Sequence, residues 1–204
     1  MAFSVSSLED DLLYVFNSMS DGDDHVFSDG IAQAFKDFLE SGEPSTQDSG
    51  TIPTGYFEGA SVSGSISASD TACAQIIYSA CEYAKEHDTG GDNYIAEKIA
   101  EGLQSMTDNA VVSTSVSGVT VPPSPPPPTI PTSGSATGSI YCVTSSVASE
   151  LKTVFGLMKA MTSGGNTYLA QEMASIVNTC LLSSSVSTQG QGNLEGSTGT
   201  GNVT

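Results

Sequence analysis

The sequence predicts a mainly α protein of three tandem helical hairpins, joined by extended Gly/Ser/Thr/Pro-rich connectors that can form short β segments. Three observations lead to this fold class. GGDNYIAEKIAEGLQSM from Gly90 and GGNTYLAQEMASIVNTC from Gly164 match in register, 74 positions apart and without a gap. Such a fixed period is typical of a tandem architecture. Apolar residues recur at helical spacing on both sides of each Gly-Gly pair, whereas the intervening segments are rich in small polar residues and proline.

The first hairpin, residues 1–42, is the most divergent copy. LEDDLLYVFNSM precedes DGDDHVFSDGIAQAFKDFL just as a first helix precedes the Gly-Gly turn in the other copies. Gly22-Asp23 aligns with Gly91-Asp92, and a one-residue gap then brings Ile31 onto Ile99. The apolar stripes place the core at Leu8, Leu12, Val15, Phe16, Met19, Phe27, Ile31, Phe35 and Phe38.

The connector 43–65 leads to the second hairpin, residues 66–109. Ser69 or Asp70 can cap its first helix, because a side-chain oxygen there accepts hydrogen bonds from otherwise unpaired N–H groups. The glycines of HDTGGD end that helix, since glycine readily adopts a left-handed turn. The predicted core positions are Ala72, Cys73, Ile76, Ile77, Ala80, Cys81 and Ala84, then Ile95, Ile99, Leu103 and Met106.

The rest of the chain continues this pattern. The connector 110–139 contains a polyproline segment, 122–128, which predicts a stiff spacer, and VVSTSVSGVTV, which alternates like a strand that needs a partner edge. A third hairpin, 140–182, and an extended C-terminal arm, 183–204, follow. Because hairpins of this size bury little surface alone, we expect association with other chains and a homo-oligomer. The third hairpin's core is predicted at Val143, Val147, Leu151, Val154, Phe155, Met158, Met161, Leu169, Met173, Val177 and Cys180.

The charge balance argues against two classes of partner. The chain has 23 acidic residues, 5 lysines and no arginine, for a formal net charge of −18. Binding to phosphate backbones or anionic lipid needs clustered cations, so we expect neither a nucleic-acid nor a membrane partner. The first residues lack a basic leader, and no apolar run approaches the about 20 residues that cross a bilayer. We therefore expect a protein made in the cytoplasm.

The four cysteines show no CxxC pairing. Cys73 and Cys81 lie eight residues apart on one predicted helix, a separation of about 12 Å at 1.5 Å per residue. This is too far for a disulfide between them, and on an apolar stripe both are expected to act as small hydrophobic side chains. We expect no metal bound by these thiols.

The turn DGDDHVFSDG is the one weak candidate for a metal site. Its carboxylates are hard oxygen ligands, but the EF-hand pattern fails because Val26 stands where glycine is required and Ala32 where the bidentate Glu belongs. A loose cation site and a solvated turn both stay open here. The candidate ligands are Asp21, Asp23 and Asp24.

Catalytic motifs are missing from the sequence. His25 and His87 lie at hairpin turns, and a metal or general-base role would need an activated partner nearby. No GxSxG elbow and no Walker-type phosphate loop occurs. The sequence therefore predicts a protein that is not an enzyme and needs no cofactor.

The hairpins at 64–109 and 138–182 each begin with Gly-Ser-Ile, and their connectors share Thr-Ile-Pro-Thr and Glu-Gly-Ala-Ser-like pieces. In this style the chain resembles accessory structural proteins of tailed-phage virions. The resemblance implies a non-enzymatic head, neck or tail component, made in the host cytoplasm and located in the virion. Its partners would be itself and other virion structural proteins. An alternative class is an acidic scaffold or binding module that docks on a basic partner protein.

Overall fold

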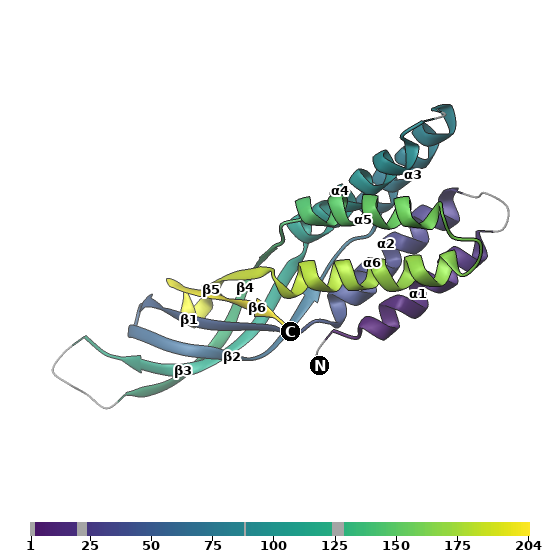
Figure 1. The fold of residues 1–204 in the computed structure, drawn as a ribbon. Coiled ribbons are helices and arrows are strands. Elements are labelled where there is room, and N and C mark those ends of the chain that lie inside the picture. The colour runs from purple at the N-terminus through teal and green to yellow at the C-terminus, as the bar shows by residue number, and fades with distance from the viewer. Residues whose placement is uncertain (1–2, 20–23, 88, 124–128) are drawn as a thin grey trace.

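The computed structural model describes residues 3–19, 24–87, 89–123 and 129–204. Within them, a pair of α-helices followed by a pair of strands occurs three times (Figure 1). The first module is α1 (Val5–Ser18), α2 (Asp24–Ser41), β1 (Pro44–Ile52) and β2 (Gly55–Ser67). The second is α3 (Thr71–Glu86), α4 (Gly91–Asn109), β3 (Val111–Val121) and β4 (Ile130–Tyr141). The third is α5 (Ser145–Met158), α6 (Gly165–Leu182), β5 (Ser185–Gln191) and β6 (Ser197–Val203), with a short 3-10 turn η1 (Gly192–Leu194) before β6.

The predicted fold class, mainly α with extended connectors, is wrong. The six strands pair antiparallel in chain order, and β6 pairs with β1, which closes a barrel. Its strands come from the connectors 43–65 and 110–139 and from the arm 183–204. Segments expected to order on other subunits therefore find their partner edges within the same chain. The polyproline segment lies mostly outside the described residues, which exclude 124–128.

The six described helices form a second closed layer. Each helix packs on the next in the chain, and α6 packs on α1, so the helical ring closes as the barrel does. The ring lies at one end of the elongated molecule and the barrel at the other, with both chain ends near the junction (Figure 1). The predicted stripes supply its core, including Leu12, Phe35 and Leu103, whereas Ala72, Val143 and Met161 were predicted wrongly and are exposed.

The repeat reflects an approximate threefold axis along the barrel. Three cross-strand pairs of buried residues surround the barrel mouth next to the helices: Ile66–Val112, Ile140–Val186 and Val203–Pro44. One level further into the barrel, each junction between neighbouring modules has the same glycine–threonine pair: Gly64–Thr114, Gly138–Thr188 and Gly201–Thr46. Equivalent residues of the three modules thus lie at the same height in the barrel.

A barrel of six strands encloses a narrow space, because barrel diameter grows with strand number. Glycine is therefore required at these inward positions. A β-carbon at Gly138 would overlap the carbonyl oxygen of Ser187, and one at Gly201 would overlap that of Ser45. The two contacts are equivalent in the repeat. The same glycines make the segments look like linkers, because glycine is unfavourable in an ordinary strand.

One disulfide crosslinks the third module. Cys142, just after β4, bonds to Cys180 of α6, with 6.4 Å between the Cα atoms and 38 residues between the two positions. The sequence analysis missed this bond. The expectation that Cys73 and Cys81 are not bonded to each other is confirmed, since both are free and buried.

Opening the disulfide should weaken the fold. Because it closes a loop of 38 residues, reduction is expected to lower the free energy of unfolding by about 3 to 4 kcal/mol. Guanidinium denaturation with and without dithiothreitol measures this difference. A Cys142→Ala/Cys180→Ala double variant should match the reduced protein and ignore the reductant. Equal midpoints for oxidised and reduced wild-type protein would contradict the crosslink.

The free thiols give the stability a dependence on alkaline pH. Burial, with a smaller contribution from Asp70, raises the pKa of Cys73 from 9.0 to about 12. Burial also raises the pKa of Cys81 to about 11, with Asp24 as the next cause. The folded state thus retains protons that the unfolded chain releases, so this stabilisation is complete below pH 9 and is lost as the pH rises towards 12.

We therefore expect Cys73→Ala to flatten the fall of stability above pH 9. Each thiol that titrates only on unfolding contributes a slope of at most about 1.4 kcal/mol per pH unit. Urea denaturation of wild type and variant between about pH 8 and pH 10.5 measures the difference in slope. In the upper part of this range the thiol is ionised in the unfolded chain but protonated in the folded protein. Parallel stability profiles for the two proteins would show that Cys73 ionises equally well in the folded state.

Candidate functional site

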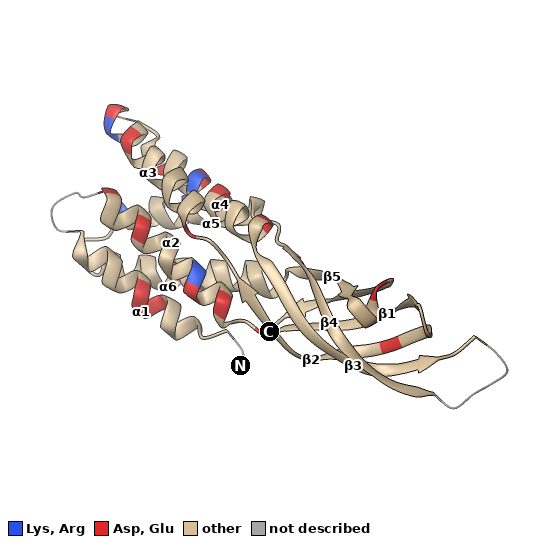
Figure 2. Cartoon of the chain, turned by 180° about the vertical axis from the view of Figure 1, so that it is seen from behind, with Lys and Arg blue, Asp and Glu red and all other residues tan. Residues whose placement is uncertain are grey.

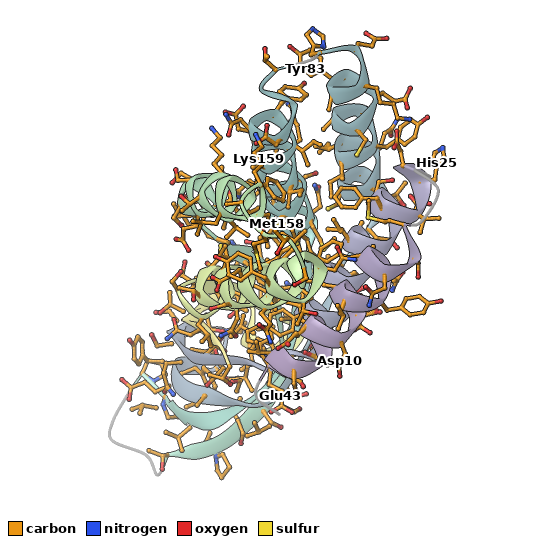
Figure 3. All side chains as sticks on the ribbon, turned by 45° about the vertical axis from the view of Figure 1, so that its right-hand side comes forward. Asp10, His25, Glu43, Tyr83, Met158 and Lys159 are labelled. Atoms are coloured by element: carbon orange, nitrogen blue, oxygen red, sulfur yellow. A yellow bond between two sulfur atoms is a disulfide. The ribbon has the colours of Figure 1, made fainter. Side chains whose placement is uncertain are left out.

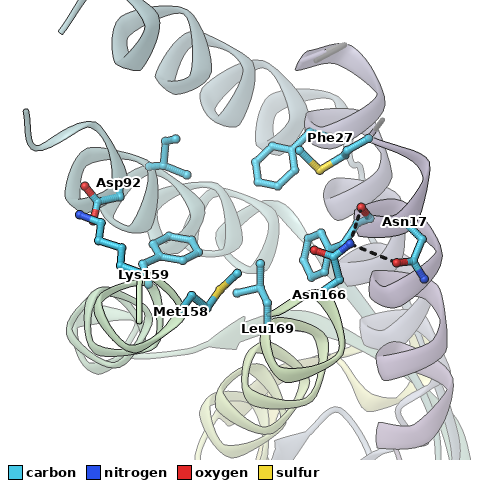
Figure 4. Close-up of a pocket in the computed structure, with 11 residues that line it drawn as sticks. Asn17, Phe27, Asp92, Met158, Lys159, Asn166 and Leu169 are labelled. Atoms are coloured by element: carbon cyan, nitrogen blue, oxygen red, sulfur yellow. Dashed lines mark hydrogen bonds and ion pairs between the residues drawn. The ribbon is translucent and has the colours of Figure 1, made fainter. Parts of the chain in front are cut away.

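All three modules meet at a pocket of about 700 Å3 in the end of the helical ring away from the barrel (Figure 4). Most of its wall is apolar, and the polar side chains lie in pairs from neighbouring helices. The apolar lining residues are Phe16, Met19, Phe27, Ile95, Phe155, Met158 and Leu169. The polar ones are Asn17, Asp92, Lys159 and Asn166.

The lining shows that the pocket lies on the threefold axis. Ile95 of α4 and Leu169 of α6 are equivalent in the 74-residue register, and Phe27 of α2 takes the same place in the first copy. Each second helix thus contributes one residue at the same position. The first helices of the three modules contribute different side chains. Phe16 of α1 and Phe155 of α5 line the pocket, whereas the corresponding residue of α3 is the smaller Cys81. The pocket is therefore an approximately threefold apolar depression.

Polar contacts join neighbouring modules around it. Lys85 Nζ lies 2.5 Å from Asp24 Oδ2, and its repeat equivalent Lys159 lies 2.9 Å from Asp92 Oδ2. Each pair links the last turn or C-cap of a first helix to the first turn of the preceding module's second helix. At the third junction the amide of Asn166 donates to the carbonyl oxygen of Phe16 and to Asn17 Oδ1, both at 3.1 Å.

These ion pairs shift the titration of their members. The hydrogen bond from Lys159 lowers the pKa of Asp92 below its ordinary value, and hydrogen bonds to Asp24 and then Glu82 raise the pKa of Lys85. The Asp92 contribution to stability is present at neutral pH and is lost as the pH falls through its lowered pKa. Because both lysines are solvent-exposed, each pair contributes little energy and mainly aligns the helices.

The candidate cation turn lies mostly outside the described residues. These exclude Asp21 and Asp23, and Asp24 begins α2 with its carboxylate on Lys85. No group of three or more His, Cys, Asp or Glu side chains suited to a metal occurs in the described part of the chain.

Both histidines stack on tyrosines. His25 lies against Tyr78 of α3 with 4.1 Å between ring centroids, and His87 lies against Tyr83 with 3.8 Å. His87 Nδ1 is also 2.8 Å from the Tyr83 carbonyl oxygen. In Figure 3, His25 and Tyr83 lie at the outer ends of their helices. The two imidazoles thus pack at the outer ends of the first and second hairpins.

One buried carboxylate, that of Asp48 in β1, was not predicted from the sequence. Its side chain points into the barrel, is 2% exposed and accepts hydrogen bonds from Thr46 and Thr188. The equivalent positions in the other modules are Val116 and Gly190. An acid at an inward position of an alternating strand is a recognisable signal, but only once the connector is identified as a strand.

No protein-family model, no curated protein and no solved structure matches this chain. The fold and the pocket define it as a threefold-repeated protein in which a helical ring is joined to a strand barrel. None of the helices in its described residues is both long and apolar enough to cross a bilayer.

Proposed function

We propose that this chain is a non-enzymatic structural protein of a viral particle that binds where three equal subunits meet. The observation that carries the proposal is the arrangement of three αα–ββ modules around one axis. A chain with three near-equivalent faces can contact three symmetry-related subunits at once, and simultaneous contacts raise the overall affinity. The resemblance of the repeat style to accessory proteins of tailed-phage virions supports the viral setting.

The pocket on the axis is the proposed attachment point. Its described lining carries no hydroxyl, thiol or imidazole group, so its chemistry suits an apolar side chain or short segment of a neighbouring protein. Phe155 and Met158 are only partly buried and can contact a partner, and Met158 is flexible enough to fit an irregular surface. The ion pair between Lys159 and Asp92 can orient a polar group at the rim.

Incorporation into particles tests the proposal. A tagged chain produced during infection by the virus that encodes it is expected in density-gradient-purified particles, at a constant copy number by quantitative mass spectrometry. Met158→Lys should reduce incorporation at least tenfold, which corresponds to about 1.4 kcal/mol of lost affinity. The matched control is Leu157→Lys on the exposed face of α5, which should incorporate normally. Recovery of the chain only in the particle-free fraction would contradict the viral role.

Self-association stays a prediction, but it no longer rests on hairpins that need other chains to bury their apolar stripes. The hairpin stripes are buried within one chain, so the pocket and the outer barrel surface are what a second copy could contact. Light scattering behind a sizing column distinguishes a monomer of 20.8 kDa from a discrete multiple of that mass.

A second candidate function follows from the charge distribution. Nineteen of the 23 acidic residues belong to the helical segments and their turns, whereas the barrel segments carry Glu43, Asp48, Glu58 and Glu195. Figure 2 shows most of the acidic residues on the helical end. This end therefore suits docking on a basic partner protein. Affinity for such a partner should fall steeply with salt, because exposed charges are screened beyond about 10 Å at 0.1 M.

A further inference from the structure

The barrel encloses a carboxylate without a cationic side chain to balance it. Asp48 is 2% exposed. The segments that form the barrel, residues 43–67, 110–141 and 183–204, contain no Lys, Arg or His. An ionised carboxylate that is buried without a counter-charge is strongly destabilising. A positive ion beside Asp48 would supply the missing counter-charge.

Two of the three threonines at one level of the barrel donate hydrogen bonds to this carboxylate. Thr46 donates to Asp48 Oδ2 at 2.6 Å, and Thr188 donates to Asp48 Oδ1 at 3.1 Å. A hydroxyl that donates its proton to a carboxylate keeps its lone pairs available for a cation. Thr114 is the repeat equivalent of Thr188 and is 3% exposed, yet its Oγ1 has no hydrogen-bond partner.

Thr114 is the second observation that favours an ion. The hydrogen bonds around Asp48 leave the Thr114 hydroxyl unpaired, because no polar atom lies within hydrogen-bonding range and geometry of it. A buried unpaired hydroxyl is costly. An ion at the centre of the threonine level would satisfy both groups, since it takes oxygen ligands from the Asp48 side and from Thr114.

We propose that Thr46, Asp48, Thr114 and Thr188 bind one small, hard, monovalent cation, with sodium as the probe. Carboxylate and hydroxyl oxygens are the ligands that hard cations prefer. One carboxylate balances one positive charge, whereas a divalent ion would leave a buried excess of charge. Each threonine at this level pairs with a glycine across the sheet, so the threonines are the side chains that this level contributes.

The surroundings of this level favour tight coordination. Apolar layers close the barrel on both sides, which lowers the local dielectric and strengthens ion–oxygen attraction. Val112, Ile140 and Val186 form part of the layer next to the helices, and Phe57 and Leu194 part of the other. Thr114 also lines a hydroxyl-rich surface hollow of about 360 Å3 next to the β2 bulge.

Thermal melting in sodium chloride and in choline chloride at equal ionic strength tests the site. Choline screens the large net charge equally but is too large for the barrel, so the difference isolates sodium binding. For the wild type we expect the melting temperature to be about 3 to 6 °C higher in about 150 mM sodium chloride. Thr114→Val and Asp48→Asn should both abolish this difference.

Thr114→Val gives opposite results for a filled and an empty site. If nothing binds, removing an unpaired buried hydroxyl leaves stability unchanged or raises it in both salts. If sodium binds, the variant melts lower than the wild type in sodium chloride and equal to or above it in choline chloride.

The matched control is Thr200→Val on the outer face of β6, which should retain the sodium-specific shift. A wild type that melts equally in both salts, or a Thr114→Val variant that keeps the full shift, would overturn the proposal. These comparisons hold even if Asp48→Asn fails to fold.

Discussion

Gly138→Ala is expected to lower the free energy of unfolding by about 3 kcal/mol, which is a large part of the stability of a protein this size. The added β-carbon would overlap the carbonyl oxygen of Ser187 in the neighbouring strand, and backbone cannot move aside as a flexible side chain can. Gly201→Ala should have a similar effect, because its β-carbon meets the carbonyl oxygen of Ser45. Urea denaturation followed by circular dichroism measures both changes.

The matched control is the same substitution in an open place. Gly156 lies on the exposed side of α5, and a β-carbon there would meet nothing within 4 Å. Because alanine favours helix over glycine by about 1 kcal/mol, Gly156→Ala should stabilise the protein slightly. If Gly138→Ala were as well tolerated as Gly156→Ala, the closely approaching strands of the barrel would be incorrect.

Deletion of residues 183–204 is expected to abolish cooperative folding. The segment supplies β5 and β6, and its loss removes the buried side chains of Val186, Leu194 and Val203. Three such side chains contribute about 5 to 9 kcal/mol in total, which is comparable to the whole stability of a domain. The deletion also exposes β1 and β4 as unpaired edges, so the truncated chain should aggregate.

Circular dichroism and thermal melting of the truncated chain measure this result. A flexible arm would be lost without effect on the helices, and helix content and the cooperative melt would stay as in the full chain. The closed barrel predicts instead a broad melt and reduced helix content, because the helical ring rests on the barrel mouth through Ile66, Ile140 and Val203. A full-length Thr198→Ala/Thr200→Ala variant, changed only at exposed positions of β6, should melt like the wild type.

The helical part of this architecture could be predicted from the sequence, because it depends on local patterns. Residues such as Leu8, Ile77 and Val177 repeat at helical spacing, and their burial confirms the predicted stripes. Such patterns depend only on neighbours three and four positions apart. The partly buried Ile95 and Met158 also belong to the stripes, and they line the pocket because the hairpin ends leave a space between the modules.

The barrel could not be predicted in the same way, because its information is not local. Pairing β1 with β6 joins Pro44 to Val203 across most of the chain. Glycine, serine and threonine normally indicate a linker, and only the narrow closed barrel makes glycine at Gly138 a requirement. Asp48 went unnoticed for the same reason, since an acid in a linker is unremarkable and becomes informative only inside a barrel.

Closure of the barrel within one chain is the central claim, and a designed crosslink between its first and last strands tests it most directly. Ser49 of β1 is paired with Thr198 of β6, and both side chains are exposed. In a Ser49→Cys/Thr198→Cys variant, mild oxidation should join these two positions within a monomer, as shown by non-reducing electrophoresis and mass spectrometry of the linked peptides. Crosslinking into dimers and larger species, or no reaction between the two cysteines, would mean that the last strands lie elsewhere and that the chain does not close on itself.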